Sequence, residues 1–566
     1  GFQLWVNERD SKKEATIDGY VVSTNDPREM SGKIFLVGGR AYPLQLDFFK
    51  RTNKKDQGKK AEIELMWKTP SGTLETIPSR HLIPAKHAEC FIPEVVFPAD
   101  DRSVGYERGT SVSRAWLDAV NLGAIEAADY VGEHLDGLAK TKHDAEDRHD
   151  KIKTFARDFY TRSQRVGKLS DAGQRVFDLV WASADNPETA VRKVVILSMT
   201  SPAFLYPGVA EKNMTDQEKI ISRLSLALWD SLPDANLRNK AATGWFRTLK
   251  NLDQLTWQMM EQSLTKEKLR QFFHHWLELD RAADVAKSET VFPEFSDAIM
   301  ADLKVSLETF IDDTIWNNGS DYRKLLTADY VYSNETLSSL YPSEKPVKGH
   351  HFRKVQLKGG QRSGVLTHPY LLTNLAYHDN TSPIHRGVFM TRHILGIALK
   401  SPPMANEFLN DEFDPHLTMR EKVTELTKAE NCMSCHSTIN PLGFSLEHFD
   451  GIGRWRHQDQ GREINSKSTL TLDNGDTIQI QSPADVAKFA VEQPSAHLAF
   501  VESLFHHTVK QPAAAYDAEH LEWLRTSFVE QNFSVLDLLK QIAFSTAKEG
   551  LDIGAMANLS PNQKSQ

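Results

Sequence analysis

The 566-residue chain is short of cysteine, of positive charge and of long apolar runs. Its 3 cysteines are too few for a scaffold held by disulfides. The 67 Lys and Arg are outnumbered by 76 Asp and Glu, and a net charge of −9 offers no basic surface for a phosphate backbone. Nucleic acid is therefore not an expected partner. No apolar run reaches the ~18–20 residues of a membrane-spanning helix, so we expect no transmembrane segment.

The rest of the composition is that of a folded protein. Hydrophobic residues make up 40% of the chain, enough for several cores, and the length predicts three to five domains. The sequence starts with Gly1 rather than Met, and its first residues, GFQLWVNERD, are typical of a strand rather than of a signal peptide. We expect the chain to begin after a removed export signal or to be part of something longer.

Two periodicities divide the chain. Residues 42–48 and 61–67 alternate apolar and polar, which predicts an antiparallel β-sandwich at the N-terminus. After a linker-like stretch the spacing becomes helical, and Thr215 and Glu218 form a capping-box pattern. The fold class is multidomain, an all-β sandwich followed by a mainly α-helical region. The predicted units are the sandwich, N-terminal helical modules, a main helical module, a looser module rich in Gly, Pro and His, and a C-terminal helical module with a tail: 1–95, 96–210, 211–342, 343–470 and 471–566.

Two of the three cysteines stand in the sequence Cys432-Met433-Ser434-Cys435-His436. C-x-x-C-H is the attachment pattern of c-type haem, in which two thiols bind the vinyl groups and the histidine ligates the iron. Two intervening residues on a helical turn set the sulfurs at the vinyl spacing. The motif predicts one covalent haem c, with His436 as proximal iron ligand, in a cytochrome c-like module at 343–470.

Two alternatives compete with haem. A zinc site needs four ligands, for which His448 and His457 are available and Cys90 is too isolated. A thioredoxin-like Cys pair belongs at a helix start after a βαβ unit, and the sequence shows none. Cys90 itself is most simply a buried, inert thiol.

The ligand opposite His436 is not set by the sequence. The first Met after Met433 is Met556, too far for the usual downstream loop. The iron either has no second protein ligand or takes one from a set of histidines and upstream methionines: His506, His507, Met404, Met419, Met390, His368, His385 and His393. Each of these is also explained as a solvated or core side chain.

Residues just after the motif are candidates for the haem surroundings. Arg454, Trp455 and Arg456 are expected to contact the propionates, since guanidinium groups match carboxylates; ordinary salt bridges are the alternative. Pro441 and Gly443 are expected to shape a loop under the imidazole, with a carbonyl there accepting the His436 Nδ1 proton.

Several stretches resemble the multidomain c-type cytochromes of planctomycetes, whose parts are mostly domains of unknown function. The resemblance extends over residues 95–548 and is carried by FPADDRSVGYERGTSVS, ISRLSLALWDSLPDANL, FFHHWLELD, RSGVLTHPYLL, TSPIHRGVFMTRHILG and the haem motif. The stretch FHHTVKQPAAAY departs from the family, where many members have a Tyr-Ala-Leu-Gly-Arg-like sequence.

The N-terminal strands resemble the second half of a PA14 domain, a β-sandwich often attached to carbohydrate-active or adhesive proteins. The matching stretches are GFQLWVNERD, GKIFLVGGRAYPLQLDFFK and AEIELMWKTPSGTLETIPSRHL. The resemblance implies a partial sandwich, with a separate N-terminal fragment as one expected partner and polysaccharide as another.

The predicted function is an exported redox protein, periplasmic or extracellular, because haem c is attached on the exported side of a bacterial membrane. The favoured hypothesis is an oxidoreductase acting on peroxide or O₂ at an accessible haem, with candidate catalytic groups among His368, His385, Arg386 and His393. One alternative is an electron-transfer cytochrome with bis-His or His/Met ligation that docks onto polysaccharide or a redox partner protein. The other is a scaffold with a structural haem.

Overall fold

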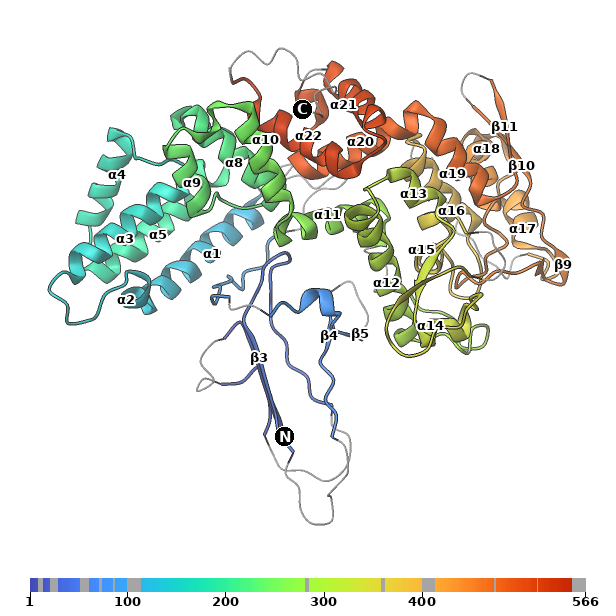
Figure 1. Cartoon of the computed structure of the whole chain (residues 1–566), viewed down its shortest axis with the longest axis horizontal. Helices are drawn as coiled ribbons and strands as arrows, with labels where there is room; N and C mark the ends of the chain where they lie inside the picture. The colour runs from blue at the N-terminus through green and yellow to red at the C-terminus, as the bar shows by residue number, and fades with distance from the viewer. Residues whose placement is uncertain are drawn as a thin grey trace, which may run out of the picture.

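The computed structural model describes residues 1–8, 14–20, 29–50, 61–70, 74–84, 87–98, 113–279, 285–357, 362–399, 413–472, 475–516 and 518–551. In Figure 1 the helices form a wide arch, with α2–α5 at one end and α16–α19 at the other. The N-terminal strands hang below the middle of the arch. None of the described helices is both long and apolar enough to cross a bilayer.

The N-terminal region forms small antiparallel sheets. Three strands pair in the order β2-β1-β3, with Leu4 of the central strand opposite both Ile17 and Leu46. A second sheet pairs β4 with β5. The strand bounds are β1 Phe2–Val6, β2 Ile17–Gly19, β3 Leu44–Phe48, β4 Met66–Lys68 and β5 Leu74–Thr76.

These sheets are smaller than predicted. The alternation at 61–67 predicts a strand throughout, but residues 61–65 are not in a strand and β4 begins at Met66. In the described part of the chain the strands form separate small sheets rather than the two packed layers of a sandwich. Large apolar side chains therefore stay exposed, such as Phe35 at 63% and Val96 at 86%.

Buried ion pairs join this region to the helices. Lys304 Nζ on α12 lies 3.0 Å from Glu75 Oε1 on β5, with both side chains at most 10% exposed. Arg80 pairs with Glu308, which also accepts a hydrogen bond from His274. Burial raises the pKa of Glu308, but His274, Arg80 and Lys304 together outweigh it and hold the carboxyl ionised.

A first helical bundle forms one end of the arch. Its separate core contains Ile152, Ala156, Phe177, Val191 and Val194, all fully buried. Polar caps begin the helices: Asn186 Oδ1, for example, accepts from Thr189 N at the start of α5. The helix bounds are α1 Arg114–Glu133, α2 Leu135–Leu138, α3 Arg148–Ser163, α4 Asp171–Ala182, α5 Pro187–Thr200, α6 Pro202–Leu205 and α7 Pro207–Ala210.

The middle and C-terminal helices share one core, which runs from Ile220 to Ala547. The predicted capping box is confirmed, with Thr215 and Glu218 bonded reciprocally at the start of α8. Module boundaries inside this core stay a prediction. The bounds are α8 Asp216–Trp229, α9 Ala235–Ala242, α10 Leu249–Met260, α11 Ser263–Trp276, α12 Asp297–Asp312, α13 Tyr322–Thr327, α14 Glu335–Leu340, α19 Pro483–Glu492, α20 Pro494–Val509, α21 Ala518–Glu530 and α22 Val535–Lys548.

The Cys-x-x-Cys-His motif lies at the other end of the arch, on α18 (Figure 1). Short strand pairs surround the helices there, β6 with β7, β8 with β9, and β10 with β11. The bounds are β6 Val331–Ser333, β7 Arg353–Val355, α15 Pro369–Asn374, α16 Pro383–Phe389, the π-helix η7 Met390–Ile394, α17 Met419–Leu426, α18 Glu430–Phe444, β8 Gln458–Asp459, β9 Arg462–Glu463, β10 Ser468–Thr471 and β11 Thr477–Ile480.

Candidate haem-attachment site

Cys432, Cys435 and His436 lie in the first half of α18. Residues at i, i+3 and i+4 share one face of a helix, so the two thiols and the imidazole point the same way. All three side chains are half-buried, and neither cysteine is in a disulfide. A flat macrocycle with two attachment points and one iron ligand needs this arrangement.

Asn440, one helical turn after His436, holds the imidazole. His436 Nδ1 lies 2.9 Å from Asn440 Oδ1, and Asn440 Nδ2 donates to Thr427 Oγ1 at 2.9 Å. Thr427 Oγ1 in turn donates to the Val423 carbonyl, so it accepts from the amide. This series of hydrogen bonds makes Asn440 Oδ1 the acceptor and His436 Nδ1 the donor, so in the neutral imidazole Nε2 carries no proton and can bind a metal.

The acceptor differs from the prediction. A backbone carbonyl in a loop around Pro441 and Gly443 was expected, but both residues lie within α18. Gly443 packs directly on α16, where a Cβ would overlap the Pro383 carbonyl oxygen. The side chain of Asn440 supplies the acceptor, and the i, i+4 spacing from His436 is the sequence signal that points to it.

Helices α16 and α18 cross closely and run antiparallel. Pro383 lies against Gly443, and a Cβ on Gly387 would overlap the Ile439 carbonyl oxygen. α16 continues into η7, which also packs on α18. By helical spacing Ile439 and Gly443 share the face of Cys432, Cys435 and His436, so this face continues toward η7.

Arg386, a candidate catalytic group, is fully buried on α16. Its Nη1 donates to the carbonyls of Leu446 and Phe449, at 3.1 and 2.8 Å, and its Nη2 to Asp450 O at 2.8 Å. Burial lowers its pKa to about 10. The guanidinium therefore holds the backbone that follows α18.

The predicted propionate partners also bind protein groups. Arg456 donates to the Glu447 and Asp459 carboxylates, at 3.2 and 2.9 Å, and Arg454 Nε to Asp450 at 2.8 Å. Trp455 stacks on His448 with centroids 4.6 Å apart. Burial raises the pKa of Glu447, although Arg456 and Arg386 oppose this. A buried ion network, rather than a surface salt bridge, occupies this position, and the contact with propionates stays a prediction.

The candidate histidines upstream of the motif are held in different places. His368 is 1% exposed; its Nε2 donates to Ser306 Oγ, and its Nδ1 accepts from Tyr370 N at the start of α15. Burial lowers its pKa to about 3, so the ring is neutral. His393 Nε2 lies 2.8 Å from Glu278 Oε1, and its ring stacks on Phe389. His385 is exposed, with its ring 5.3 Å from that of Tyr377.

His506 and His507 are not brought to the motif. His507 Nε2 lies 3.0 Å from the Lys268 carbonyl on α11, and His506 Nε2 accepts from Ala513 N at 3.1 Å. Burial lowers the pKa of both, that of His507 well below its usual value. Figure 1 shows α20, which carries them, in the middle of the arch and α18 toward its end.

The candidate methionine ligands also lie in different parts of the structure. Met404 lies outside the described residues. Met419 is buried at the start of α17, beside Arg420, whose guanidinium lies 4.5 Å from the Phe444 ring at the far end of α18. Met390, the first residue of η7, is fully buried, and η7 packs on α18.

The described residues do not support the two alternatives to haem, a zinc site and a thioredoxin-like Cys pair. Across the described ranges, no three His, Cys, Asp or Glu side chains gather as metal ligands, so a zinc site is not formed there. The described strands pair antiparallel throughout, and thus form no βαβ unit before the Cys pair. Cys90 is half-exposed rather than buried, with its backbone N–H bonded to Asn7.

Comparison with known proteins places the motif within a cytochrome-associated family domain. Residues 362–459, which contain it, match the family model PSCyt3, a protein of unknown function (DUF1588). Residues 216–342 match PSD4, also of unknown function (DUF1592). The chain therefore carries domains of planctomycete-type cytochrome-associated families, as the resemblance implied. Neither of these two matches covers the N-terminal strands, and the PA14 resemblance stays a prediction. Comparison with curated proteins and with solved structures gives no significant match.

Proposed function

We propose that this protein is an exported redox protein with one covalent haem c on α18. Cys432 and Cys435 are the attachment thiols and His436 is the proximal ligand. The observation that carries the proposal is the His436–Asn440 hydrogen bond, at 2.9 Å, on the face that also bears both thiols. Metal-ligating histidines characteristically donate their second ring nitrogen to such an acceptor.

The residues of the Cys-x-x-Cys-His motif fit a covalently attached haem. The thiols are unpaired and half-buried, and the imidazole presents Nε2 on their side of the helix. Haem c, when bound, exchanges single electrons at its iron. Asn440 and Thr427 fix the ring orientation, and Arg386 stiffens the backbone that follows α18 through its carbonyl contacts.

The activity depends on whether a protein side chain occupies the sixth coordination position of the iron. We favour an oxidoreductase that binds peroxide or O₂ at an accessible iron. Its support is the engagement of the candidate distal histidines elsewhere: His368 with Ser306, His507 with Lys268 and His393 with Glu278. The alternative is electron transfer with His/Met ligation, favoured by Met390, which is buried in η7, the element that packs on α18.

Location and partners follow from the cofactor and the N-terminal region. Haem c attachment places the protein in the periplasm or outside the cell. Exposed apolar side chains around the small sheets, such as Phe35, support a surface that takes a further partner. That partner is a strand-bearing fragment, a polysaccharide or a redox protein.

The test is a visible spectrum of the protein produced with the haem-attachment machinery, oxidised, reduced, and reduced with CO. We expect covalent haem in the wild type, retained in Cys90→Ala and lost from the double variant Cys432→Ala/Cys435→Ala. Cys90 is the matched control because it lies outside the motif. A wild type without haem bands under these conditions contradicts the proposal.

The same spectra separate the two activities. A high-spin ferric form that binds CO on reduction supports an accessible iron. A low-spin form unchanged by CO supports two firm ligands, and Met390→Leu is then expected to convert it to a CO-binding form.

A further inference from the structure

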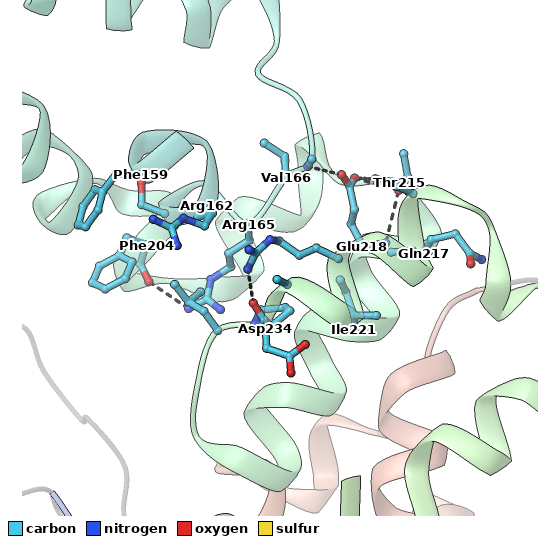
Figure 2. Close-up of a pocket in the computed structure, with 18 of the residues that line it drawn as sticks. Phe159, Arg162, Arg165, Val166, Phe204, Thr215, Gln217, Glu218, Ile221 and Asp234 are labelled. Carbon is cyan, nitrogen blue, oxygen red and sulfur yellow. Dashed lines mark hydrogen bonds between the residues drawn. The ribbon is translucent and has the colours of Figure 1, made fainter. Parts of the chain in front are cut away.

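A cavity of about 850 Å³ lies far from α18, between the first helical bundle and α8–α9. Figure 2 shows Arg162, Arg165, Phe159 and Phe204 on one side of it and Thr215, Gln217, Glu218 and Ile221 on the other. Its apolar lining includes Phe159, Val166, Met199, Phe204, Ile221 and Leu232. The volume is that of a small-molecule site.

Three arginines line this cavity and donate hydrogen bonds to backbone carbonyls rather than to carboxylates. Arg165 Nη2 donates to Phe204 O at 3.3 Å, Arg238 Nη1 to Pro233 O at 2.6 Å, and Arg162 Nε to Asp158 O at 3.3 Å. All these acceptors are backbone carbonyls. Among the side chains that the structure describes, none of the three guanidinium groups forms an ion pair.

Arg165 has unused donors. Its Nε and Nη1 are buried and have no hydrogen-bond partner among the described residues. Burial lowers the pKa of Arg165 and of Arg238; at Arg238 the charge of Arg162 lowers it further, while Asp234 and Asp158 oppose this. Buried guanidinium donors that lack hydrogen-bond partners are costly, and a ligand that accepts from them would remove this cost.

The backbone conformation of Arg165 also supports a role in ligand binding. The residue follows α3 with φ +61°, a left-handed conformation that favours glycine. An arginine in this conformation carries backbone strain that a glycine would not.

The acidic residues of the cavity already accept hydrogen bonds from nearby backbone and hydroxyl groups. Glu218 accepts from Thr215 N and Oγ1 in the capping box, and from the Gly167 amide. Asp234 Oδ1 accepts from Leu237 N at 2.8 Å as the cap of α9. Asp234 partly offsets the charge of Arg238, but no carboxylate among the described side chains offsets that of Arg165.

From this arrangement we infer that the cavity binds a small organic carboxylate with an apolar body, whose carboxylate accepts hydrogen bonds from Arg165. The apolar side chains take the body of the ligand, and Arg162 and Arg238 add positive charge beside its head group. The site is distinct from the haem-attachment site and does not depend on it.

The test is calorimetric titration of the full chain with 4-phenylbutyrate, and with its neutral amide as matched ligand. We expect the carboxylate to bind at millimolar concentration and the amide to bind about tenfold more weakly or not at all. Arg165→Gln is expected to weaken the carboxylate about tenfold or more, and Arg175→Gln, an exposed arginine on α4, to change it less than about twofold. Equal binding of acid and amide, or equal binding by wild type and Arg165→Gln, overturns the inference.

A second variant separates ligand binding from a structural role. Arg165→Gly removes the guanidinium and relieves the left-handed strain, so we expect a higher thermal midpoint together with lost carboxylate binding. A lower midpoint with binding unchanged means that Arg165 serves the fold, and contradicts the inference.

Discussion

His436 Nδ1 donates to Asn440 Oδ1 across 2.9 Å, one helical turn away. We expect the neutral imidazole of the haem-free protein to carry its proton on Nδ1, whereas free histidine prefers Nε2. Asn440→Leu removes the acceptor and is expected to shift the proton to Nε2, while Asn440→Asp keeps it on Nδ1. Nitrogen NMR of the ring distinguishes the tautomers. An Nε2 proton in the wild type contradicts the proximal-ligand geometry.

The close crossing of α16 and α18 predicts a steric effect at Gly443. A Cβ there meets the Pro383 backbone oxygen, which cannot move without its helix. We expect Gly443→Ala to reduce the free energy of unfolding by about 3 kcal/mol, measured by urea denaturation. Gly137→Ala on α2, where nothing lies within 4 Å, is the control and is expected to be neutral or slightly stabilising. Equal effects at the two sites would show that the helices are less closely packed.

Two buried tyrosines predict opposite effects of losing a hydroxyl. Tyr322 is fully buried, and its hydroxyl has no partner among the described residues, whereas Tyr341 Oη donates to Ile452 O at 2.7 Å. We expect Tyr322→Phe to raise the free energy of unfolding by about 1 kcal/mol and Tyr341→Phe to lower it by about 1–2 kcal/mol. Paired urea titrations test this, and a destabilised Tyr322→Phe would mean that the hydroxyl has an acceptor in solution.

The buried, neutral His368 predicts a loss of stability in acid. Its pKa is lowered from 6.5 to about 3, so between these values the unfolded chain binds a proton that the folded protein does not. Stability therefore falls as pH drops through this window, by about 2 kcal/mol between pH 7 and pH 5.

Two variants isolate this effect of His368. His368→Asn keeps an acceptor for Tyr370 N and is expected to flatten the pH dependence of the unfolding free energy. Ser306→Ala lowers stability at every pH but keeps the slope, because the imidazole stays buried. An unchanged slope in His368→Asn would show that other groups cause the acid loss.

Local patterns predicted the parts of the structure that depend on local forces. The capping box at Thr215 and Glu218 involves four consecutive residues, and the alternation over Leu44–Phe48 produced β3. The sandwich was the weaker prediction, because alternation shows that a strand has two faces but not that a second layer covers one of them. Asn440 was missed although its spacing from His436 was visible, since the acceptor was sought in a loop.

The sequence by itself determined the Cys-x-x-Cys-His motif, the helical periodicity and the net negative charge, all properties of neighbouring residues or of composition. Only the tertiary structure decided which histidines lie near α18, that Arg386 holds carbonyls rather than facing a cavity, and that Arg162, Arg165 and Arg238 line one cavity. These depend on how helices distant in sequence pack, which Gly387, Gly443 and the shared core control through contacts that no local pattern records.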